Sequence, residues 1–363
     1  MAQTIRVDLG ERSYDVRVGS GLLESVGAAA AGLPSVRQAA VIADSNIADD
    51  YGRRIVDSLA AAQIDATLLE YPAGEANKNI SVFSDLLDAV FAIAPAIDRD
   101  LLVVACGGGV TGDVAGYVAA STLRGVRWIQ CPTSLLADVD ASVGGKTGIN
   151  HPSGKNLIGA FYQPSGVLID VETLKTLPPE ELESGLGECV KHAVIRDASL
   201  LEFIAENTQA ILDCQSDVMC DLVARNVAIK AAVVAGDERE SGTRAHLNYG
   251  HTVGHAIETI AGYGTISHGA AVSLGMIAAN GMAVARGLIS PADAARVCGA
   301  LEALKLPTAF GGLDFDEVWR VMQHDKKARG GRVRMVLPTE IGSVDIFDDI
   351  TAEETARAVA LLG

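Results

Sequence analysis

The stretch that decides the fold class is Leu101-Leu-Val-Val-Ala-Cys-Gly-Gly-Gly-Val-Thr-Gly-Asp113. A continuous apolar run that leads into glycines and then a helical pattern is typical of a buried parallel strand followed by a helix. Glycines allow a backbone to approach a phosphate, and the N–H groups at a helix N-terminus attract anions. The spacing Gly107-x-Gly109-x-x-Gly112 also fits a dinucleotide-binding turn. A tight turn without a ligand is the alternative, because such a fingerprint normally follows the first strand and this one follows a fourth or fifth.

Apolar runs and helical periodicity alternate on both sides of this stretch. Short runs at 5–9 and 14–18 predict paired strands, and runs at 39–43, 67–71, 128–131 and 166–169 predict further strands. Helical patterns follow the third run to about residue 62 and cover 80–93. After Pro178-Pro179 helices are expected almost throughout to about residue 288, with a short strand at 333–337 and a last helix at 353–362. We therefore expect an α/β chain whose first part is a parallel sheet covered by helices and whose second part is mainly helical.

Composition excludes several classes of protein. The 363 residues correspond to about two domains, and 38 glycines with 4% aromatic residues are typical of an α/β enzyme. The net charge of −17 disfavours nucleic acid and anionic membranes, although it does not exclude a local cationic pocket. The six cysteines form no CxxC pair, so we expect reduced, largely buried thiols. The first residues are too charged for a signal peptide, and the apolar stretch 269–285 predicts a buried helix. We expect a cytoplasmic protein.

A second segment, residues 124–156, is dense in small and polar residues. It contains Arg124, Asp138, Asp140, Ser142, Gly144-Gly-Lys146, Asn150 and Gly154-Lys-Asn156. A P-loop is excluded because that motif requires glycine at position 140, where Asp140 stands. Two lysines beside carboxylate and amide groups predict a loop that binds a polar, anionic small molecule. A solvated surface loop is the alternative.

Three of the seven histidines lie close together in the second half of the chain. His251 and His255 are four residues apart and so share one face of a helix. The residue after His251 is Thr252 rather than glutamate, which excludes the usual metalloprotease motif. His268 or a carboxylate such as Glu188 would complete a zinc-type site, and a structural histidine pair is the alternative. The charged segment 237–244, just before the histidines, predicts either site residues or an exposed turn.

Taken together, several segments resemble 3-dehydroquinate synthases over nearly the whole chain. The most specific of them are residues 107–113, 124–127, 139–150, 154–164, 247–258 and 325–327. The resemblance implies a lyase of the shikimate pathway that depends on NAD and on zinc or cobalt. It would convert 3-deoxy-D-arabino-heptulosonate 7-phosphate into 3-dehydroquinate and phosphate. The implied steps are transient oxidation at C5, phosphate elimination, reduction, ring opening and an intramolecular aldol reaction.

The resemblance also implies an architecture and a set of site residues. Residues 1–176 would form a Rossmann-like NAD-binding domain, and residues 177–363 a helical metal- and substrate-binding domain, with the site between them. The implied metal ligands are Glu188, His251 and His268. The implied cofactor residues are Asp44, Asn46, Glu75, Lys78, Gly108, Gly109, Val110, Asp113, Thr133, Ser134 and Lys155. The implied substrate residues are Arg124, Asp140, Lys146, Asn156, Lys191, Lys230, Arg244, Asn248, His255, His268 and Lys326, with Lys327 as the alternative to Lys326.

Within these sets the implied catalytic residues are Glu240 and His255, which would move protons, together with Lys146, Lys191, Arg244 and Asn248. Arg124 would reach the substrate phosphate of a neighbouring subunit, which implies a homodimer. Some positions depart from the family pattern: Ala270 stands where glutamate is usual, and His192 follows Lys191 where tyrosine is usual. We expect Ala270 to change the polar surroundings of His268.

Three alternatives stay open, and the departures from the family pattern bear on the first of them. One is a related cyclase that acts on sedoheptulose 7-phosphate or glucose 6-phosphate, and another is a metal-dependent polyol dehydrogenase. The third is a paralogue that binds ligands without turnover. The cationic and amide side chains favour a substrate that carries a carboxylate, because they would neutralise it or hydrogen-bond to it.

Overall fold

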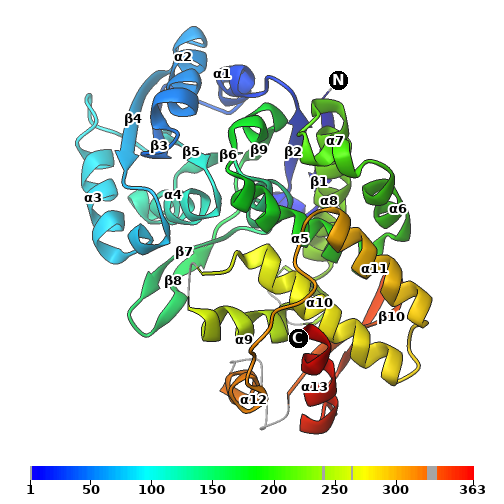
Figure 1. The fold of residues 1–363 in the computed structure, drawn as a ribbon. Coiled ribbons are helices and arrows are strands. Elements are labelled where there is room, and N and C mark those ends of the chain that lie inside the picture. The colour runs from blue at the N-terminus through cyan, green and yellow to red at the C-terminus, as the bar shows by residue number, and fades with distance from the viewer. Residues whose placement is uncertain (1, 239–241, 263–264, 325–332) are drawn as a thin grey trace. The chain divides into compact units, whose positions relative to one another are not determined.

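A computed structural model describes residues 2–238, 242–262, 265–324 and 333–363 (Figure 1). The chain divides into two compact units. The first comprises Met1–Leu177 and Met219–Ala235, and the second Pro178–Val218 and Gly236–Gly363. Most of helix α8 (Ser216–Gly236) therefore belongs to the first unit, although it lies within the second half of the sequence. The assignment of separate functional domains to 1–176 and 177–363 stays a prediction.

The first unit is built on a seven-stranded sheet with the order β1-β2-β9-β6-β5-β3-β4. Its strands are β1 (Gln3–Val7), β2 (Tyr14–Gly19), β3 (Gln38–Asp44), β4 (Asp65–Tyr71), β5 (Leu102–Gly107), β6 (Arg127–Pro132) and β9 (Gly166–Asp170). Only β1 and β2 pair in an antiparallel manner; every other neighbouring pair is parallel. The parallel sheet and the strands predicted from apolar runs are confirmed.

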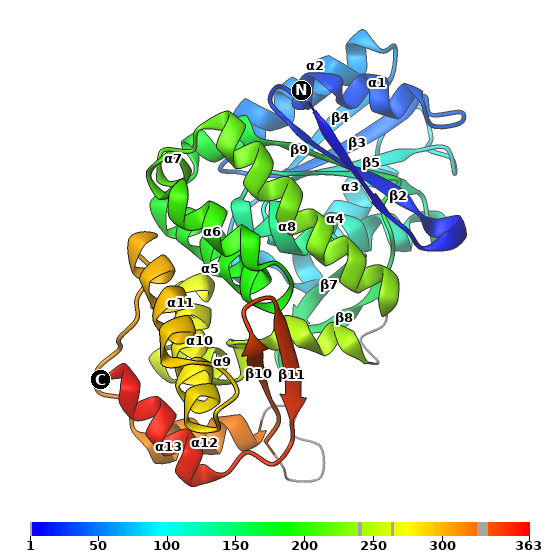
Figure 2. The same cartoon turned by 90° about the vertical axis from the view of Figure 1, so that its right-hand side faces the viewer.

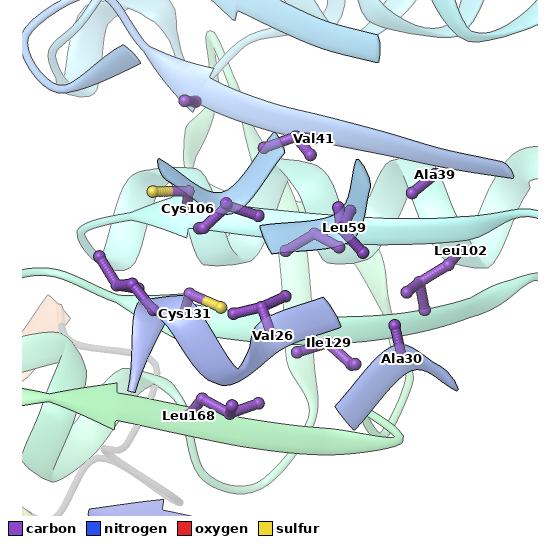
Figure 3. Close-up of a cluster of buried hydrophobic side chains, with 14 of the residues drawn as sticks. Val26, Ala30, Ala39, Val41, Leu59, Leu102, Cys106, Ile129, Cys131 and Leu168 are labelled. Atoms are coloured by element: carbon purple, nitrogen blue, oxygen red, sulfur yellow. The ribbon is translucent and has the colours of Figure 1, made fainter. Parts of the chain in front are cut away.

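Helices cover both faces of this sheet, which explains the continuous apolar runs. Alternate residues of a strand point to opposite faces, so Val41 and Ile42 of β3 enter different cores. The helices α1 (Val26–Ala31) and α2 (Arg53–Ala61) pack on one face, where Figure 3 shows Val26 and Leu59 with strand residues from β3, β5, β6 and β9. The helices α3 (Ile80–Phe91) and α4 (Gly109–Ser121) pack on the other face.

The strand order places a topological switch point between β3 and β5. The chain passes from β3 to β4 on one side of β3, and then crosses to β5 on the other side. Ligands of open α/β sheets bind outside the carboxyl ends of the strands at such a point. Here those ends are Asp44 of β3 and Gly107 of β5. The fold therefore puts the glycine cluster at a ligand-binding position even though it follows the fifth strand in chain order.

The prediction of a polar loop over residues 124–156 is wrong from residue 146 onward, where the chain forms strands. Residues Lys146–His151 (β7) and Gly154–Phe161 (β8) form an antiparallel hairpin, with Gly148 opposite Gly159. A Cβ on Gly148 would lie 2.5 Å from the carbonyl oxygen of Ile158, so the strands approach more closely than larger residues allow. The first unit also contains the short helical turns η1 (Gly10–Arg12), η2 (Leu23–Ser25), η3 (Ala48–Gly52), η4 (Glu75–Asn77), η5 (Thr122–Arg124), η6 (Ala137–Ala141) and η7 (Val171–Thr176).

The second unit is mainly helical, as predicted. It contains α5 (Pro179–Arg196), α6 (Ala198–Glu206), α7 (Thr208–Leu212), η8 (Thr243–Asn248), α9 (His251–Ala261), α10 (His268–Ala285), α11 (Pro291–Ala303), α12 (Phe315–His324), β10 (Met335–Glu340), β11 (Ser343–Phe347), α13 (Ala352–Val359) and η9 (Ala360–Leu362). Figure 2 shows α10 among its neighbours α9, α11 and α13 and the antiparallel pair β10–β11. The predicted strand and last helix are confirmed.

Helix α10 is the apolar centre of this unit. Among the described residues, α10 is the helix that has the length and hydropathy of a membrane span. However, 72% of its residues are buried inside the protein, which is typical of a core helix. Ser267 caps its N-terminus by accepting a hydrogen bond from the N–H of Ala270. A Cβ on Gly275 would overlap the carbonyl oxygen of Gly250, and a Cβ on Gly187 would lie 2.6 Å from that of Gly269. Glycine thus allows the backbones of α5, α10 and the start of α9 to touch.

We predict that Gly275→Ala lowers the free energy of unfolding by about 3 kcal/mol or more, because the new methyl group overlaps a backbone atom that cannot move alone. Gly299→Ala is the matched control: this glycine lies inside α11, and a Cβ there would have no atom within 4 Å. Gly299→Ala should stabilise the protein by about 0.5–1 kcal/mol, since alanine loses less conformational entropy in a helix. Urea unfolding followed by circular dichroism measures both changes, and equal stability of the two variants would contradict the packing argument.

Candidate active site

The carboxyl ends of β3 and β4 hold a hydrogen-bonded acid. The hydroxyl of Thr111 donates to Asp44 Oδ2 at 3.2 Å, and Tyr71 Oη lies 2.9 Å from Thr111 Oγ1. Burial raises the pKa of Tyr71, so its hydroxyl stays protonated and donates to Thr111. The N–H of Asn46 donates to Asp44 Oδ1 at 3.0 Å. Two predicted cofactor residues are therefore brought together and oriented.

Sequence interpretation did not single out Tyr71 or Thr111. A signal for Tyr71 existed, because Tyr71 and Asp44 are the last residues of neighbouring strands and lie opposite each other in the register. Thr111 belongs to the quoted glycine stretch, but its orientation toward Asp44 depends on the turn geometry.

The glycine turn after β5 leaves the start of helix α4 open to a ligand. Gly108 is the N-cap residue and provides no side-chain cap, and the first turn of the helix carries no acidic residue. A Cβ on Gly112 would overlap the side-chain amide of Gln130, so this glycine permits close packing of α4 on β6. The N–H groups at Gly109 and Val110 can thus donate hydrogen bonds to a phosphate group.

The residues that follow β6 border the same turn. The N–H of Thr133 donates to the carbonyl oxygen of Gly107 at 3.1 Å. Ser134 is the next residue and is buried, as is Thr133. Two further predicted cofactor residues thus lie beside the glycine turn.

Lys78 is the centre of a second polar cluster. Its ammonium lies 2.5 Å from Asp113 Oδ2 and 2.5 Å from Asn156 Oδ1, and its side chain is only 5% exposed. Burial raises the pKa of Asp113, while the positive charge of Lys78 acts in the opposite direction. The amide of Asn150 donates to Glu75 at 2.7 Å, and the N–H of Asn150 donates to the carbonyl oxygen of Lys78. The hairpin β7–β8 is therefore tied to predicted cofactor residues.

The remaining predicted residues of the first unit are dispersed. Lys230 on α8 is buried and forms an ion pair with the half-buried Asp140. Lys146 and Lys155 are exposed on the hairpin, and Arg124 is exposed at the left-handed end of η5, with φ of 67°. The structure therefore joins Lys230 with Asp140, whereas Arg124 forms no hydrogen bond or ion pair with the other described site residues.

Asp138, from the same polar segment, is fully buried, and neither carboxylate oxygen has a hydrogen-bond partner among the described residues. Burial, and then the charge of Asp170, raises its pKa well above the ordinary value. This residue therefore belongs to the interior rather than to a ligand-binding surface.

Three side chains from three helices of the second unit form a candidate metal centre. Glu188 lies on α5, His251 is the first residue of α9, and His268 is the first residue of α10. Glu188 Oε1 lies 3.4 Å from Nε2 of His251 and 3.6 Å from Nε2 of His268. One carboxylate oxygen and two imidazole nitrogens are the donor set that zinc and cobalt prefer.

The geometry of the carboxylate fits a bound cation. The second oxygen of Glu188 forms an ion pair with Lys191, one helical turn away. Glu188 Oε1 is buried and accepts no hydrogen bond from the described residues, although it faces two ring nitrogens. An unsatisfied buried carboxylate oxygen is costly, and a cation at this point would satisfy it.

The protonation states differ within the cluster. Burial alone would raise the pKa of Glu188, but Lys191 and the two histidines outweigh it and hold that pKa well below the usual range. Burial lowers the pKa of His251 well below 6.5, so its ring stays neutral. Burial also opposes the charge on His268, yet the neighbouring carboxylates of Glu188 and Glu258 outweigh it and raise its pKa to about 10. Glu188 and His251 thus have the states of metal ligands, and His268 would release a proton on binding.

Other predicted residues of the second unit lie around the same helices. His255 is on the same face of α9 as His251, and their ring centroids are 5.3 Å apart. Arg244 on η8 is buried, and its guanidinium donates to the carbonyl oxygen of Glu238 at 2.5 Å. Asn248 ends the same turn. Asp237 accepts hydrogen bonds from the N–H groups of Gly242 and Arg244, so the described part of segment 237–244 is not an exposed turn.

Two predicted site residues, Glu240 and Lys326, lie outside the described residues, as does Lys327. Sequence interpretation missed Glu258, which contacts His268. It lies seven residues after His251 on α9, so a carboxylate on the same helix face was the available signal.

Comparison of the fold with solved structures identifies the class of enzyme to which the chain is similar. A 2-epi-5-epi-valiolone synthase from Streptomyces hygroscopicus subsp. jinggangensis, with NAD+ and Zn2+ bound, superposes with a TM-score of 0.85 at 29% identity, and 98% of each chain is covered. A 2-deoxy-scyllo-inosose synthase complexed with carbaglucose-6-phosphate, NAD+ and Co2+ gives a TM-score of 0.87 at 26% identity, with 99% of each chain covered. The chain therefore has the fold of the sugar phosphate cyclases.

Sequence comparison narrows this class to one family. Residues 68–184 match the model of the 3-dehydroquinate synthase N-terminal region, and residues 185–328 match the C-terminal region. The 3-dehydroquinate synthase of Desulforamulus reducens is 46% identical over 348 residues, which cover 96% of each chain. This chain belongs to the 3-dehydroquinate synthase family, and the predicted resemblance is confirmed.

We predict that His251→Asn and Glu188→Gln each weaken zinc binding more than about 100-fold, because each removes one of three ligand atoms and substitutions that merely misorient a ligand already weaken binding roughly 10–100-fold. His246→Asn is the control: this histidine lies on η8 and contacts Arg196 at 3.3 Å. Equilibrium dialysis followed by metal analysis measures the binding. Wild-type zinc content in both ligand variants would contradict this site.

Proposed function

We propose that this chain catalyses the reaction after which its family is named. It converts 3-deoxy-D-arabino-heptulosonate 7-phosphate into 3-dehydroquinate and phosphate, with NAD and zinc or cobalt as cofactors. The observation that carries the proposal is the unsatisfied Glu188 Oε1 that faces two imidazole nitrogens, in a chain whose family relationship extends over nearly its full length. The substrate is a phosphorylated sugar acid, so the site must bind two anionic groups.

Glu188, His251 and His268 would hold the divalent cation. When bound, a zinc or cobalt ion polarises substrate oxygen atoms and stabilises a developing alkoxide. Lys191 keeps Glu188 ionised through their buried ion pair, so the carboxylate remains a ligand at neutral pH. The backbone carbonyl of Tyr249 holds Nδ1 of His251 at 3.0 Å and leaves Nε2 for the cation.

The carboxyl ends of β3 and β5 would hold the dinucleotide. When bound, NAD supplies a hydride acceptor that is regenerated in each turnover. Asp44, held by Thr111, would accept hydrogen bonds from a ribose, and the open start of α4 would hold the pyrophosphate. Lys78 and Asp113 would support the same pocket, with Asn46, Glu75, Thr133, Ser134 and Lys155 at its border.

Cationic and amide side chains would recognise the substrate carboxylate and phosphate. Lys191, Lys230 and Arg244 are buried, and a buried cation attracts an anion far more strongly than a solvated one does. Lys146, Asn156, Asn248 and Lys326 would add hydrogen bonds, and Asp140 would bind hydroxyl groups. His255 and Glu240 would transfer protons. Positioning by so many groups suits a reaction in which one bound substrate undergoes several steps.

We infer that the enzyme is a cytoplasmic homodimer that binds neither nucleic acid nor membranes. Arg124 supports the dimer, because this exposed cation forms no hydrogen bond or ion pair with the described site residues of its own chain. It would contact the substrate phosphate bound by the partner subunit. The net charge of −17 supports the absence of polyanionic partners.

The substrate assay separates this function from its alternatives. With NAD and zinc or cobalt added, the protein should release phosphate from the heptulosonate phosphate without net accumulation of NADH. Sedoheptulose 7-phosphate and glucose 6-phosphate lack the carboxylate, so their phosphate release should be slower by roughly 10⁴-fold. Phosphate release and NADH absorbance are followed in the same sample. Faster turnover of either other sugar phosphate would favour a related cyclase, and net NADH would favour a polyol dehydrogenase.

A substitution at the end of β3 tests the cofactor pocket. Asp44→Asn should weaken NAD binding roughly 10- to 100-fold, because a charge-assisted hydrogen bond to the ribose contributes about 1.5–3 kcal/mol. The loss for NADP should be smaller, since the carboxylate also repels a 2′-phosphate. Calorimetric titration with both dinucleotides measures the change. Asp57→Asn, at an exposed position on α2, is the control, and equal NAD affinity of the two variants would exclude Asp44 from the pocket.

A further inference from the structure

The imidazole of His268 lies between two carboxylates. Its Nε2 is 3.6 Å from Glu188 Oε1, and its Nδ1 is 3.2 Å from Glu258 Oε2. Glu258 lies on α9, on the same face as His251 and His255, and its side chain is 15% exposed. A carboxylate accepts hydrogen bonds and cannot donate one when ionised, so Nδ1 carries a proton and donates it in the hydrogen bond to Glu258.

The second histidine of the cluster is held in a parallel way by a different group. Nδ1 of His251 lies 3.0 Å from the carbonyl oxygen of Tyr249, and its Nε2 faces the same oxygen of Glu188. Both rings are therefore anchored through Nδ1 and present Nε2 to one point. The anchor of His251 is backbone, whereas the anchor of His268 is a side chain that a substitution can remove.

His268 needs such an anchor more than His251 does. Its side chain is 29% exposed, against 12% for His251, so less of the surrounding protein restricts the ring. It is also the first residue of α10, so the helix provides a following turn but no preceding turn to pack against its side chain. The residue two positions later, Ala270, has no polar side chain with which to hold the ring.

We propose that Glu258 is a positioning residue that fixes the ring orientation and the tautomer of His268, so that Nε2 becomes the metal ligand. A carboxylate hydrogen-bonded to the outer nitrogen of a histidine also increases the electron donation of the inner nitrogen to a metal. The inference rests on the proposed function of the Glu188–His251–His268 cluster as a metal site. It adds a specific role for a residue that does not itself touch the metal.

The same side chains allow a competing arrangement. His255, Glu258 and His268 offer ligand atoms that lie within 4.8 Å of one another, so they could hold a second cation. That cation would need Nδ1 of His268 as a ligand, and this nitrogen cannot both donate to Glu258 and bind a metal. The two arrangements therefore predict different metal contents, one ion per chain for a positioning role and two for a second site.

The experiment compares Glu258→Ala and Glu258→Gln with the wild-type protein. The control is Glu353→Gln, which changes an exposed glutamate on α13 in the same unit. Zinc affinity is measured by competition with a chelating dye, and metal content by mass spectrometry. The visible absorption spectrum of the cobalt-loaded protein reports the ligand geometry directly, and thermal melting of the metal-free proteins reports stability.

We expect Glu258→Ala to weaken zinc binding roughly 10- to 100-fold and to change the cobalt spectrum. Glu258→Gln keeps an oxygen acceptor without the charge, so its affinity should lie between those of Glu258→Ala and the wild type. The metal-free proteins should melt close to the wild type, and the control should match it in every measurement. Wild-type affinity and spectrum in Glu258→Ala would overturn the proposal, as would two zinc ions per chain.

The design also separates failure of this inference from failure of the metal site. If His251→Asn abolishes zinc binding while Glu258→Ala leaves it unchanged, the metal site stands and the positioning role is wrong. If the wild-type protein binds no zinc or cobalt at all, both are wrong. A loss of thermal stability in metal-free Glu258→Ala with an unchanged cobalt spectrum would show a purely structural role and would also overturn the proposal.

Discussion

The candidate metal centre depends on the contact between the backbone of α10 and those of its neighbours. Gly275 lies against the carbonyl oxygen of Gly250, one residue before the first residue of α9, and Gly187 lies against Gly269 near the start of α10. Three of these four glycines adjoin a ligand in sequence: Gly187 precedes Glu188, Gly250 precedes His251, and Gly269 follows His268. Because the backbones touch at these points, three side chains from three helices converge, with both imidazole Nε2 atoms within 3.6 Å of one carboxylate oxygen. Larger residues would separate the helices and move the ligand atoms apart.

Ion pairs stabilise the positively charged side chains that this acidic protein holds in its interior. Lys78, Lys191 and Lys230 are each less than 10% exposed, and each lies against a carboxylate of its own unit. A buried ammonium without a partner would lose its proton or destabilise the fold. The pairs therefore allow positive charge to persist in places from which water is largely excluded. The net charge of −17 says nothing about these positions, because it is a sum over all charged residues of the chain.

Local patterns were sufficient for the sheet and for the ligand-bearing helices. The strand β5 is a continuous apolar run because both of its faces are covered, and that property is visible in one segment alone. His251 and His255 share a helix face because they are four residues apart, and this spacing is visible in the sequence. The hairpin β7–β8 was not predicted, since its strands contain glycine, lysine and asparagine and lack an apolar alternation. Its pairing is set by close backbone approach at Gly148 and Gly159, which involves no local periodicity.

Long-range contacts explain what else local patterns could not predict. Helix α8 lies in the sequence among helices of the second unit, but Lys230 on it pairs with Asp140 of the first. Tyr71 reaches Asp44 only through Thr111, and Glu258 meets His268 only because α10 begins beside α9. Tyr71 and Glu258 each act through another side chain, so their roles are visible only once both partners are placed in three dimensions. The resemblance to a family supplied the residues that touch ligands, whereas the residues that hold them in place came from the geometry.

The two histidines of the metal centre show why this distinction matters for function. A backbone carbonyl such as that of Tyr249 cannot be altered by substitution, so the orientation of His251 follows from the fold itself. Glu258 differs from a backbone carbonyl, since it adds a negative charge next to the ring of His268 as well as a hydrogen bond. The charge strengthens the donor atom of His268, and with it the attraction of the centre for a cation. The fold therefore sets where the ligands meet, while the polar residues behind them set how strongly the centre binds.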